Sequence, residues 1–309
     1  MTVPKRSPFV SLIVVSHNEG VWLRRTVNSI ARTTPMSAEV LVVDDDSTDG
    51  SVDRLLPQEG VTVFRPGRRL GAARARNFGA QRAKGHILVF CDAHIAPPQG
   101  WLPPFRAALA RPGVGLVGPA YTEMNSREEK GYGLGFMDAG LNCNWLDQCS
   151  SAPYEVPLLG GFFVGIRREL FFEVGGFDPG FGMWGMEDFE LVMRIWGLGY
   201  RCMLLPGVEV AHLDASLRSG AADYQGDERR WIQTTLRFAV LHLGERRLRR
   251  VFRFYAKDPC FPAALAGLAV SDAWNKRAAI HEQRARGDDW FFWRFSRRLL
   301  VDGDRMWSP

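Results

Sequence analysis

The sequence lacks long apolar runs. None of its 309 residues belong to a stretch of the roughly 18 apolar residues that a membrane-spanning helix needs. The longest candidate, residues 259–270, is interrupted by two prolines and a glycine. Basic residues stand near the N-terminus, but no apolar segment precedes the first strand-like run. We therefore expect neither a transmembrane helix nor a secretory signal.

Cysteine is scarce and irregularly spaced. The five cysteines form an odd set without a C-x-x-C pair: Cys91, Cys143, Cys149, Cys202 and Cys260. This pattern argues against a disulfide framework or a structural zinc site and indicates reduced thiols. We accordingly expect a cytoplasmic protein.

Charge is unevenly distributed along a chain that is otherwise ordinary, with 46% hydrophobic and 24% charged residues. Residues 229–309 hold 17 Lys and Arg against 8 Asp and Glu, a balance of +9, which leaves −4 for residues 1–228. The acidic body shows no nucleic-acid module, so nucleic acid is not expected as a partner. For the basic tail an anionic membrane surface or a lipid-linked phosphate fits better.

The first part of the chain alternates two kinds of segment. Short apolar runs predict strands at 9–16, 40–43, 61–64 and 86–91, and stretches between them predict helices at 21–30, 51–56 and 71–84. This alternation favours an α/β fold, a mainly parallel sheet with helices on both faces. Further along, we expect a loop at 147–157, strands at 161–166 and 208–210, and a helix at 187–198.

Polar side chains follow three of the predicted strands. His17, Asn18 and Glu19 come after the first strand, an acidic cluster over 44–50 after the second, and Asp92 and His94 after the fourth. Ligands of such sheets bind in the crevice at the carboxyl ends of the strands. The pattern therefore predicts one ligand site at this edge.

Two spacings suggest specific chemistry. Asp92 and His94 lie two residues apart at a strand end, and His212 follows another predicted strand, so together they could hold manganese, zinc or iron. The acidic cluster over 44–50 begins like a calcium-binding EF-hand loop but has Leu56 where that loop needs Glu. This departure favours a loop that accepts hydrogen bonds from a nucleobase or ribose. Glu187 and Asp188 open a predicted helix, where they serve either as dipole-stabilising caps or as a general base.

Four segments carry a family resemblance. They read VSLIVVSHNEG, VVDDDSTDGS, GAARARNFGAQRAKGHILVFCDAH and GGFDPGFGMWGMEDFELVMRIWGLGY. Together they resemble the family-2 glycosyltransferases of the GT-A fold, over about residues 9–215. The D-x-H triplet and the W-G-x-E-x-x-E-x-x-x-R-I-W pattern are similar to those of the polypeptide N-acetylgalactosaminyltransferases.

The resemblance implies roles for individual residues. It implies a divalent metal, Mn²⁺ with Mg²⁺ as the alternative, held by Asp92, His94 and His212. It implies that a nucleotide-sugar donor contacts a further set: Val15, His17, Glu19, Asp44, Asp45, Asp46, Arg74, Arg76, Asp92, Gly160, Gly161 and Trp184. It also divides the chain into a GT-A domain at 1–228, with a donor half at about 1–95 and an acceptor half at about 96–228, and a helical region at 229–309.

From this resemblance we expect a metal-dependent enzyme that moves a sugar from a nucleotide diphosphate sugar, most simply UDP-linked, to an unknown acceptor. The family's Glu-Asn pair is Glu187-Asp188 here, which favours an inverting reaction with Asp188 as the base while Glu187 orients the sugar or acceptor. Two alternatives stay open: a retaining N-acetylhexosaminyltransferase-like enzyme, and an inactive sugar-nucleotide-binding protein. A pyrophosphorylase would need a basic Gly-rich loop after the first strand, where residues 16–20 read SHNEG.

The C-terminal region mixes arginines with aromatic residues. Arginines between 246 and 253 stand beside Phe252 and Phe254, and residues 290–293 read WFFW before Arg294, Arg297 and Arg298. One interpretation is peripheral contact with the inner face of an anionic membrane. The other is that the aromatic residues pack on the catalytic domain while the arginines are solvated.

Overall fold

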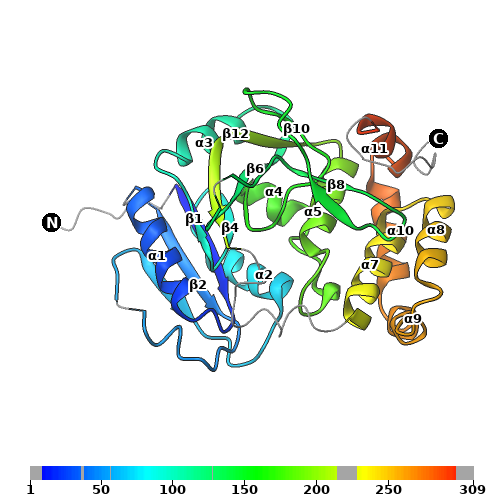
Figure 1. Cartoon of the computed structure of the whole chain (residues 1–309), viewed down its shortest axis with the longest axis horizontal. Helices are drawn as coiled ribbons and strands as arrows, with labels where there is room; N and C mark the ends of the chain where they lie inside the picture. Colours follow the sequence, from blue (N-terminus) through cyan, green and yellow to red (C-terminus); the bar gives the residue numbers. More distant parts are fainter. Residues whose placement is uncertain (1–8, 36–37, 56, 127, 214–227, 297–309) are drawn as a thin grey trace.

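The computed structural model describes residues 9–35, 38–55, 57–126, 128–213 and 228–296. Within these ranges one large sheet contains ten strands: β1 (Val10–Ser16), β2 (Glu39–Asp44), β3 (Val61–Phe64), β4 (Ile87–Asp92), β5 (Ile95–Ala96), β6 (Val114–Glu123), β7 (Lys130–Gly131), β10 (Tyr154–Glu155), β11 (Phe163–Arg167) and β12 (Arg201–His212). The order is β10-β12-β6-β11-β4-β1-β2-β3, with β5 beside β12 and β7 beside β6. Figure 1 labels the longer strands of this sheet: β12, β6, β4, β1 and β2. A separate pair consists of β8 (Leu134–Phe136) and β9 (Cys143–Trp145).

The centre of the sheet is parallel and buried on both faces. β3, β2, β1 and β4 run parallel, and β11 enters antiparallel between β4 and β6. Leu12 and Val14 of β1 point to α1 (Val21–Thr33) and α3 (Leu102–Leu109), whereas Ile13 points to the opposite face. That second face is covered by α2 (Ala72–Arg82), α4 (Arg168–Glu173) and α5 (Glu187–Gly197). The expected α/β architecture is confirmed.

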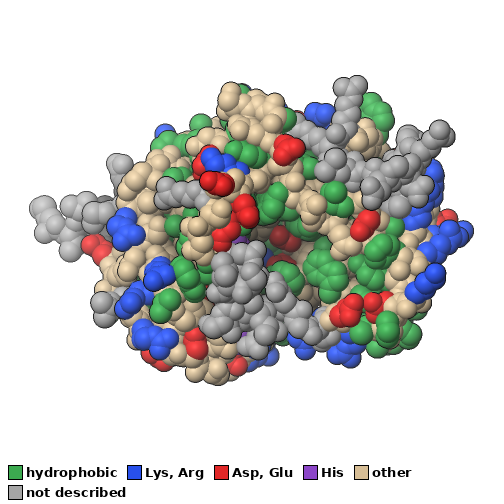
Figure 2. Space-filling model, viewed as in Figure 1, with side chains coloured by type: hydrophobic (Ala, Val, Ile, Leu, Met, Phe, Trp, Pro, Cys, Tyr) green, Lys and Arg blue, Asp and Glu red, His purple; other side chains and the backbone are tan. Residues whose placement is uncertain are grey.

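The C-terminal region is helical, as predicted. It contains α7 (Glu228–His242), α8 (Glu245–Tyr255), α9 (Phe261–Ala269), α10 (Ala273–Gln283) and α11 (Asp288–Arg294). These helices gather at one end of the molecule beside α5 (Figure 1), and their buried side chains belong to the same hydrophobic cluster as one face of the sheet. Figure 2 shows Lys and Arg side chains along this end. No helix in the described part of the chain is both long and apolar enough to cross a membrane.

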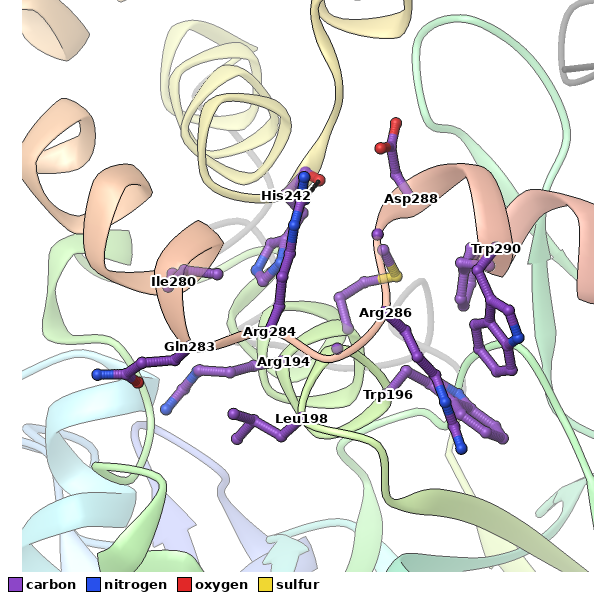
Figure 3. A pocket seen from close by; sticks show the side chains of 14 residues that line it. Arg194, Trp196, Leu198, His242, Ile280, Gln283, Arg284, Arg286, Asp288 and Trp290 are labelled. Carbon is purple, nitrogen blue, oxygen red and sulfur yellow. Dashed lines mark hydrogen bonds between the residues drawn. The ribbon is translucent and has the colours of Figure 1, made fainter.

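A small cavity lies where α5 meets α10 and α11 (Figure 3). Its volume is about 30 Å³, and Trp196, Arg194, His242 and Trp290 are among its walls. The fully buried Trp196 ring packs 5.6 Å from Trp290. Since a cavity needs about 10–15 Å³ to hold a single water, this one has room for water but not for a sugar. The contact between α5 and the C-terminal helices is therefore a packing interface.

Two local predictions need correction. Residues 51–54 form hydrogen-bonded turns instead of a helix, because only a few residues separate Gly50 (φ 70°) from Pro57 and helix nucleation is costly over so short a stretch; Leu56 lies outside the described residues. The loop expected at 147–157 contains β10, which pairs with β12 through Tyr154 and Leu204.

Candidate active site

Asp92, His94 and His212 converge at the carboxyl edge of the sheet. Asp92 ends β4, His94 lies in the turn before β5, and β5 pairs with β12 so that Ile95 is opposite His212. One ligand atom from each of the three side chains lies within 4.8 Å of the other two. Asp92 Oδ2 is 3.3 Å from His212 Nε2 and 3.8 Å from His94 Nε2. The predicted metal-binding residues are thus brought together.

The charge environment keeps Asp92 ionised. Burial alone would raise the pKa of this carboxyl, but the hydrogen bond with His212 and the nearby His94 ring and Arg76 guanidinium outweigh it and hold the pKa well below its ordinary value. One carboxylate and two imidazoles form a donor set that suits Mn²⁺ among other divalent metals. The residues present therefore fit the metal that the resemblance implies.

Glu19 lies behind His94, which the sequence did not predict. His94 Nδ1 donates to Glu19 Oε2 at 3.0 Å, and both side chains are buried. A carboxylate on Nδ1 fixes the tautomer and leaves the Nε2 lone pair for a metal. Glu19 was expected at the base and ribose of a nucleotide; the structure places its carboxylate against a metal-binding histidine.

Arg76 connects the two halves of the site. This buried side chain reaches from α2 and donates from Nη1 to Glu187 Oε1 at 2.7 Å and from Nη2 to Asp92 Oδ1 at 3.2 Å. Arg74, two residues earlier, lies on the exposed side of α2, and no ion pair joins it to the other described residues. Arg74 is therefore not part of this network, because residues two apart on a helix point in different directions. Its expected contact with the donor stays a prediction.

Glu187 and Asp188 open α5 but differ in environment. Glu187 is buried, and while one of its oxygens accepts from Arg76 the other accepts from Gly185 N at 2.8 Å. Its carboxylate is thus hydrogen-bonded within the protein, and its expected role in orienting the sugar or acceptor stays a prediction. Asp188 is half-buried, and its Oδ2 accepts from Gly161 N at 2.8 Å.

The pKa of Asp188 rises from 3.8 to about 7. Burial is the main cause, and the negative charge of Glu187 adds to it. Arg76 and the backbone N–H groups of Gly161 and Phe189 lower the pKa but do not compensate. Burial thus outweighs the stabilisation that backbone N–H groups at the start of a helix give to this carboxylate.

Gly161 is required by the closeness of Asp188. A Cβ on Gly161 would lie 2.9 Å from the Asp188 Cβ, a distance that real Cβ atoms do not show. The adjacent Gly160 is less constrained, since its Cβ would meet the Phe162 ring at 3.0 Å. The glycine pair thus lets the start of β11 approach the carboxylate of α5.

The acidic loop after β2 is held in place by hydrogen bonds within the protein. Asp45 is fully buried and accepts from the backbone N–H groups of Leu70 and Gly71, which ties the loop to the start of α2. His17 donates from Nδ1 to the Asp45 carbonyl at 2.8 Å. Asp45 was expected to face a uridine; its carboxylate accepts hydrogen bonds from these backbone groups, and contact with a nucleotide stays a prediction.

The neighbouring residues Asp44 and Asp46 have different environments. Asp44 ends β2, accepts from Ser47 N at 2.9 Å and lies 3.7 Å from the Arg65 guanidinium. Asp46 is exposed with a positive φ of 65°. Val15 is aligned with Asp92 across β1 and β4, next to the metal-binding residues.

The loop before α5 closes on the start of α2. Met183 O accepts from Ala72 N at 2.8 Å, and a Cβ on Gly71 would lie 2.2 Å from Gly182 O. The neighbouring Trp184 is 40% exposed and lies 6.0 Å from Trp231 of α7. The W-G-x-E-D motif is thereby held between α2 and α7.

An aromatic surface beside His212 was not predicted. Trp145 of β9 stacks on Tyr121 of β6 with a centroid distance of 4.4 Å, and Tyr121 lies 5.9 Å from the His212 ring. Trp145 remains 37% exposed. No periodic signal marked this residue, because it lies in a three-residue strand. Figure 2 shows His, Asp and Glu side chains inside a hollow near the middle of the face in view.

Comparison with known proteins decides the family. The model "Glycosyl transferase family 2" matches residues 11–175, more than half of the chain. The chain belongs to glycosyltransferase family 2. A second model, "N-terminal domain of galactosyltransferase", matches residues 149–214 of this glycosyltransferase.

The family-2 chain is similar to several named relatives. It is 33% identical over 235 residues to the human N-acetylgalactosaminyltransferase 7, covering 66% of this chain and 35% of the relative. It is 31% identical over 239 residues to the probable N-acetylgalactosaminyltransferase 6 of Caenorhabditis elegans, covering 69% and 38%. The chain therefore spans little more than a third of the length of these relatives.

Solved structures support the GT-A fold. The crystal structure of GalNAc-T7 with UDP, GalNAc and Mn²⁺ matches with a TM-score of 0.76 and 27% identity, covering 93% of this glycosyltransferase and 56% of that chain. The mannosyltransferase PcManGT of Pyrobaculum calidifontis, in complex with GDP-Man and Mn²⁺, matches with a TM-score of 0.53 and 24% identity, covering 90% and 75%. The predicted family and fold are confirmed.

Proposed function

We propose that this chain transfers a sugar from a UDP-linked donor to the hydroxyl of an acceptor, with Mn²⁺ as cofactor. The observation that carries the proposal is the convergence of Asp92, His94 and His212, together with Asp188, whose charge acts on the same Arg76 guanidinium that contacts Asp92. The relatives named as N-acetylgalactosaminyltransferases and the two neighbours determined with Mn²⁺ support it.

Three residues would hold the metal: Asp92, His94 and His212. Bound there, Mn²⁺ would neutralise the charge of the diphosphate leaving group. Glu19 orients His94, and Arg76 holds Asp92 and Glu187 in a fixed relation. Arg76 thus connects the D-x-H motif to the W-G-x-E-D motif in one hydrogen-bonded arrangement.

Asp188 acts as the general base in this proposal. A pKa of about 7 gives a carboxylate that accepts a proton far better than an ordinary Asp and is still substantially ionised at neutral pH. Oδ2 accepts from Gly161 N and Oδ1 from Phe189 N, both at 2.8 Å, so the carboxylate is fixed in place while each oxygen keeps a lone pair for a proton. A base that removes the acceptor proton during a single displacement produces inversion at the anomeric carbon.

Asp188→Asn tests the assignment. Turnover should fall by about 100-fold or more with donor affinity nearly unchanged, since a base acts in the transition state. Proton coupling constants of the wild-type product should show the inverted anomer. A retained anomer would favour the retaining N-acetylhexosaminyltransferase-like alternative. Donor binding without any release of UDP would instead favour an inactive sugar-nucleotide-binding protein.

We also propose that the protein is cytoplasmic and contacts the inner face of an anionic membrane through α8. Phe291 and Phe292 are buried and Trp290 is half-buried against Trp196, so packing accounts for most of the C-terminal aromatic residues. Contact with a membrane is supported by the exposed arginine and aromatic side chains of the C-terminal helices: Arg246, Arg249, Arg253, Phe254, Trp274 and Trp293. Arg297 and Arg298 lie outside the described residues.

Co-sedimentation with vesicles tests this contact. Binding should increase with the fraction of phosphatidylglycerol in phosphatidylcholine vesicles and decrease in the Arg249→Glu, Arg253→Glu variant. Arg111→Glu, the same charge reversal on the exposed end of the catalytic domain, is the matched control. Binding that is independent of anionic lipid would leave packing as the whole role of the region.

A further inference from the structure

A basic groove lies at the edge of the sheet opposite the catalytic centre. It has a volume of about 480 Å³ and is lined by Phe9, Lys84, His86, Ile87, Arg106, Leu109, Ala110, Arg167, Arg168 and Glu169. Ile87 begins β4 and Asp92 ends it, so five residue steps of about 3.3 Å place the groove roughly 17 Å from the metal-binding residues. The groove is thus separate from the site described above.

The groove is strongly cationic on an acidic part of the chain. Four Lys and Arg line it against a single carboxylate, Glu169. Residues 1–228 as a whole carry a net charge of −4, so this clustering does not follow from their composition. Like charges placed together in a groove create a local positive potential that attracts anions.

Two of the cations are anchored by the fold. Arg167 donates to the carbonyl groups of Leu109 and Val114, both at 2.7 Å, and Arg168 donates to Ala83 O at 3.2 Å. These bonds fix the guanidinium groups in place without neutralising their charge. The back of the groove is therefore preorganised and positive.

The other two cations are open to a ligand. Lys84 and Arg106 are exposed, and no ion pair of either side chain occurs among the described residues; Arg106 only lies over the Phe9 ring at 5.4 Å. The nearby Glu39 carboxylate accepts from Ser11 Oγ and from the backbone N–H of Lys84, not from its ammonium. Two exposed cationic side chains thus line the groove together with two that are held by carbonyl groups.

We propose that the basic groove binds a ligand through its phosphate groups. Guanidinium groups pair with phosphate oxygens by two parallel hydrogen bonds, and the ammonium of Lys84 adds a point charge. A volume of about 480 Å³ falls in the range of small-molecule sites and accommodates a phosphorylated metabolite as well as a phospholipid headgroup. Both ligands would be recognised through their phosphate groups, and the experiments below distinguish a soluble ligand from a lipid headgroup.

The probe is inorganic pyrophosphate, titrated into the full chain in the presence of a chelator so that no metal is held at the catalytic centre. Calorimetry should show saturable binding that weakens about tenfold in Arg106→Ala and in Lys84→Ala, as expected for loss of one charged contact. Arg111→Ala removes an exposed arginine just beyond the groove and should bind as wild type does. His212→Ala should also bind normally, because its site is at the other end of β4.

Vesicles of phosphatidylcholine with and without phosphatidic acid distinguish the sources. If Arg106→Ala also weakens binding to phosphatidic acid vesicles, the ligand is a lipid headgroup; if it affects only pyrophosphate, the ligand is soluble. Absence of saturable pyrophosphate binding at millimolar concentration would overturn the proposal. So would equal weakening in Arg111→Ala, or loss of binding in His212→Ala alone. Unchanged circular dichroism of each variant confirms that it is folded.

Discussion

Among single residues, Glu19 has a role that depends on one hydrogen bond. Because it fixes the His94 ring, Glu19→Ala should weaken Mn²⁺ binding by about 10- to 100-fold, and Glu19→Gln, which can still accept from Nδ1, by less. Electron paramagnetic resonance of free Mn²⁺ measures this affinity without any substrate. Glu209→Ala removes an exposed carboxylate of β12 and serves as the control. Equal Mn²⁺ affinity in Glu19→Ala and wild type would show that Glu19 does not position the ligand.

Asp188 links activity and stability to pH. The folded chain retains a proton on Asp188 between its ordinary pKa of 3.8 and about 7, whereas the unfolded chain has released it. Through this group the free energy of unfolding should therefore decrease as the pH rises over that range. Asp188→Asn should flatten this decrease in denaturant titrations while the rate loses its rise near pH 7. A variant with an unchanged stability profile would refute the raised pKa.

Among the elements, α5 is attached to its surroundings by a buried ion network. Glu190 accepts from Arg194 Nε at 2.9 Å and lies 3.3 Å from His242 Nε2 of α7, while Arg194 also donates to Gly176 O. Burial raises the pKa of Glu190, but Arg194 and His242 more than reverse this and lower it to about 2. The second Glu of the W-G-x-E-x-x-E pattern is thus structural.

Removing one partner of such a network leaves uncompensated buried charge. Glu190→Ala should reduce the free energy of unfolding by about 3–5 kcal/mol. Glu209→Ala, which breaks the exposed pair with Lys130, should cost less than about 1 kcal/mol. Urea titrations compare the two, and similar losses would mean that the Glu190 network does not hold α5 to α7.

On the scale of the whole molecule, the sequence predicts the sheet and the three side chains that converge at its carboxyl edge. Asp92 and His94 share a strand end, and His212 follows a recognisable strand, so local pattern suffices to find them. Glu19 and Arg76 are different, because their partners are 75 and 111 residues away. Only the packing of α2 and the loop after β1 on the sheet decides that one carboxylate meets His94 and one guanidinium meets Glu187.

The same limit applies to residues whose tertiary contacts have no signal in the sequence. Asp45 looks like a ligand-binding carboxylate in the sequence, but its oxygens are used by backbone N–H groups at the start of α2. No pattern in the sequence indicates a role for Trp145, because its place beside Tyr121 depends on the packing of β9 against the sheet. Charge and motif identify which residue types gather at an edge of the sheet, and tertiary hydrogen bonds decide which of them remain open to a ligand.

The central claim is that Asp92, His94 and His212 hold a divalent metal for sugar transfer, and its most direct test is the release of UDP from a UDP-linked sugar by the purified protein. We predict release that stops in chelator, returns with Mn²⁺ and falls by about 100-fold or more in His212→Ala. Arg111→Ala should behave as wild type. UDP release that persists in chelator, or wild-type release by His212→Ala, would contradict the account.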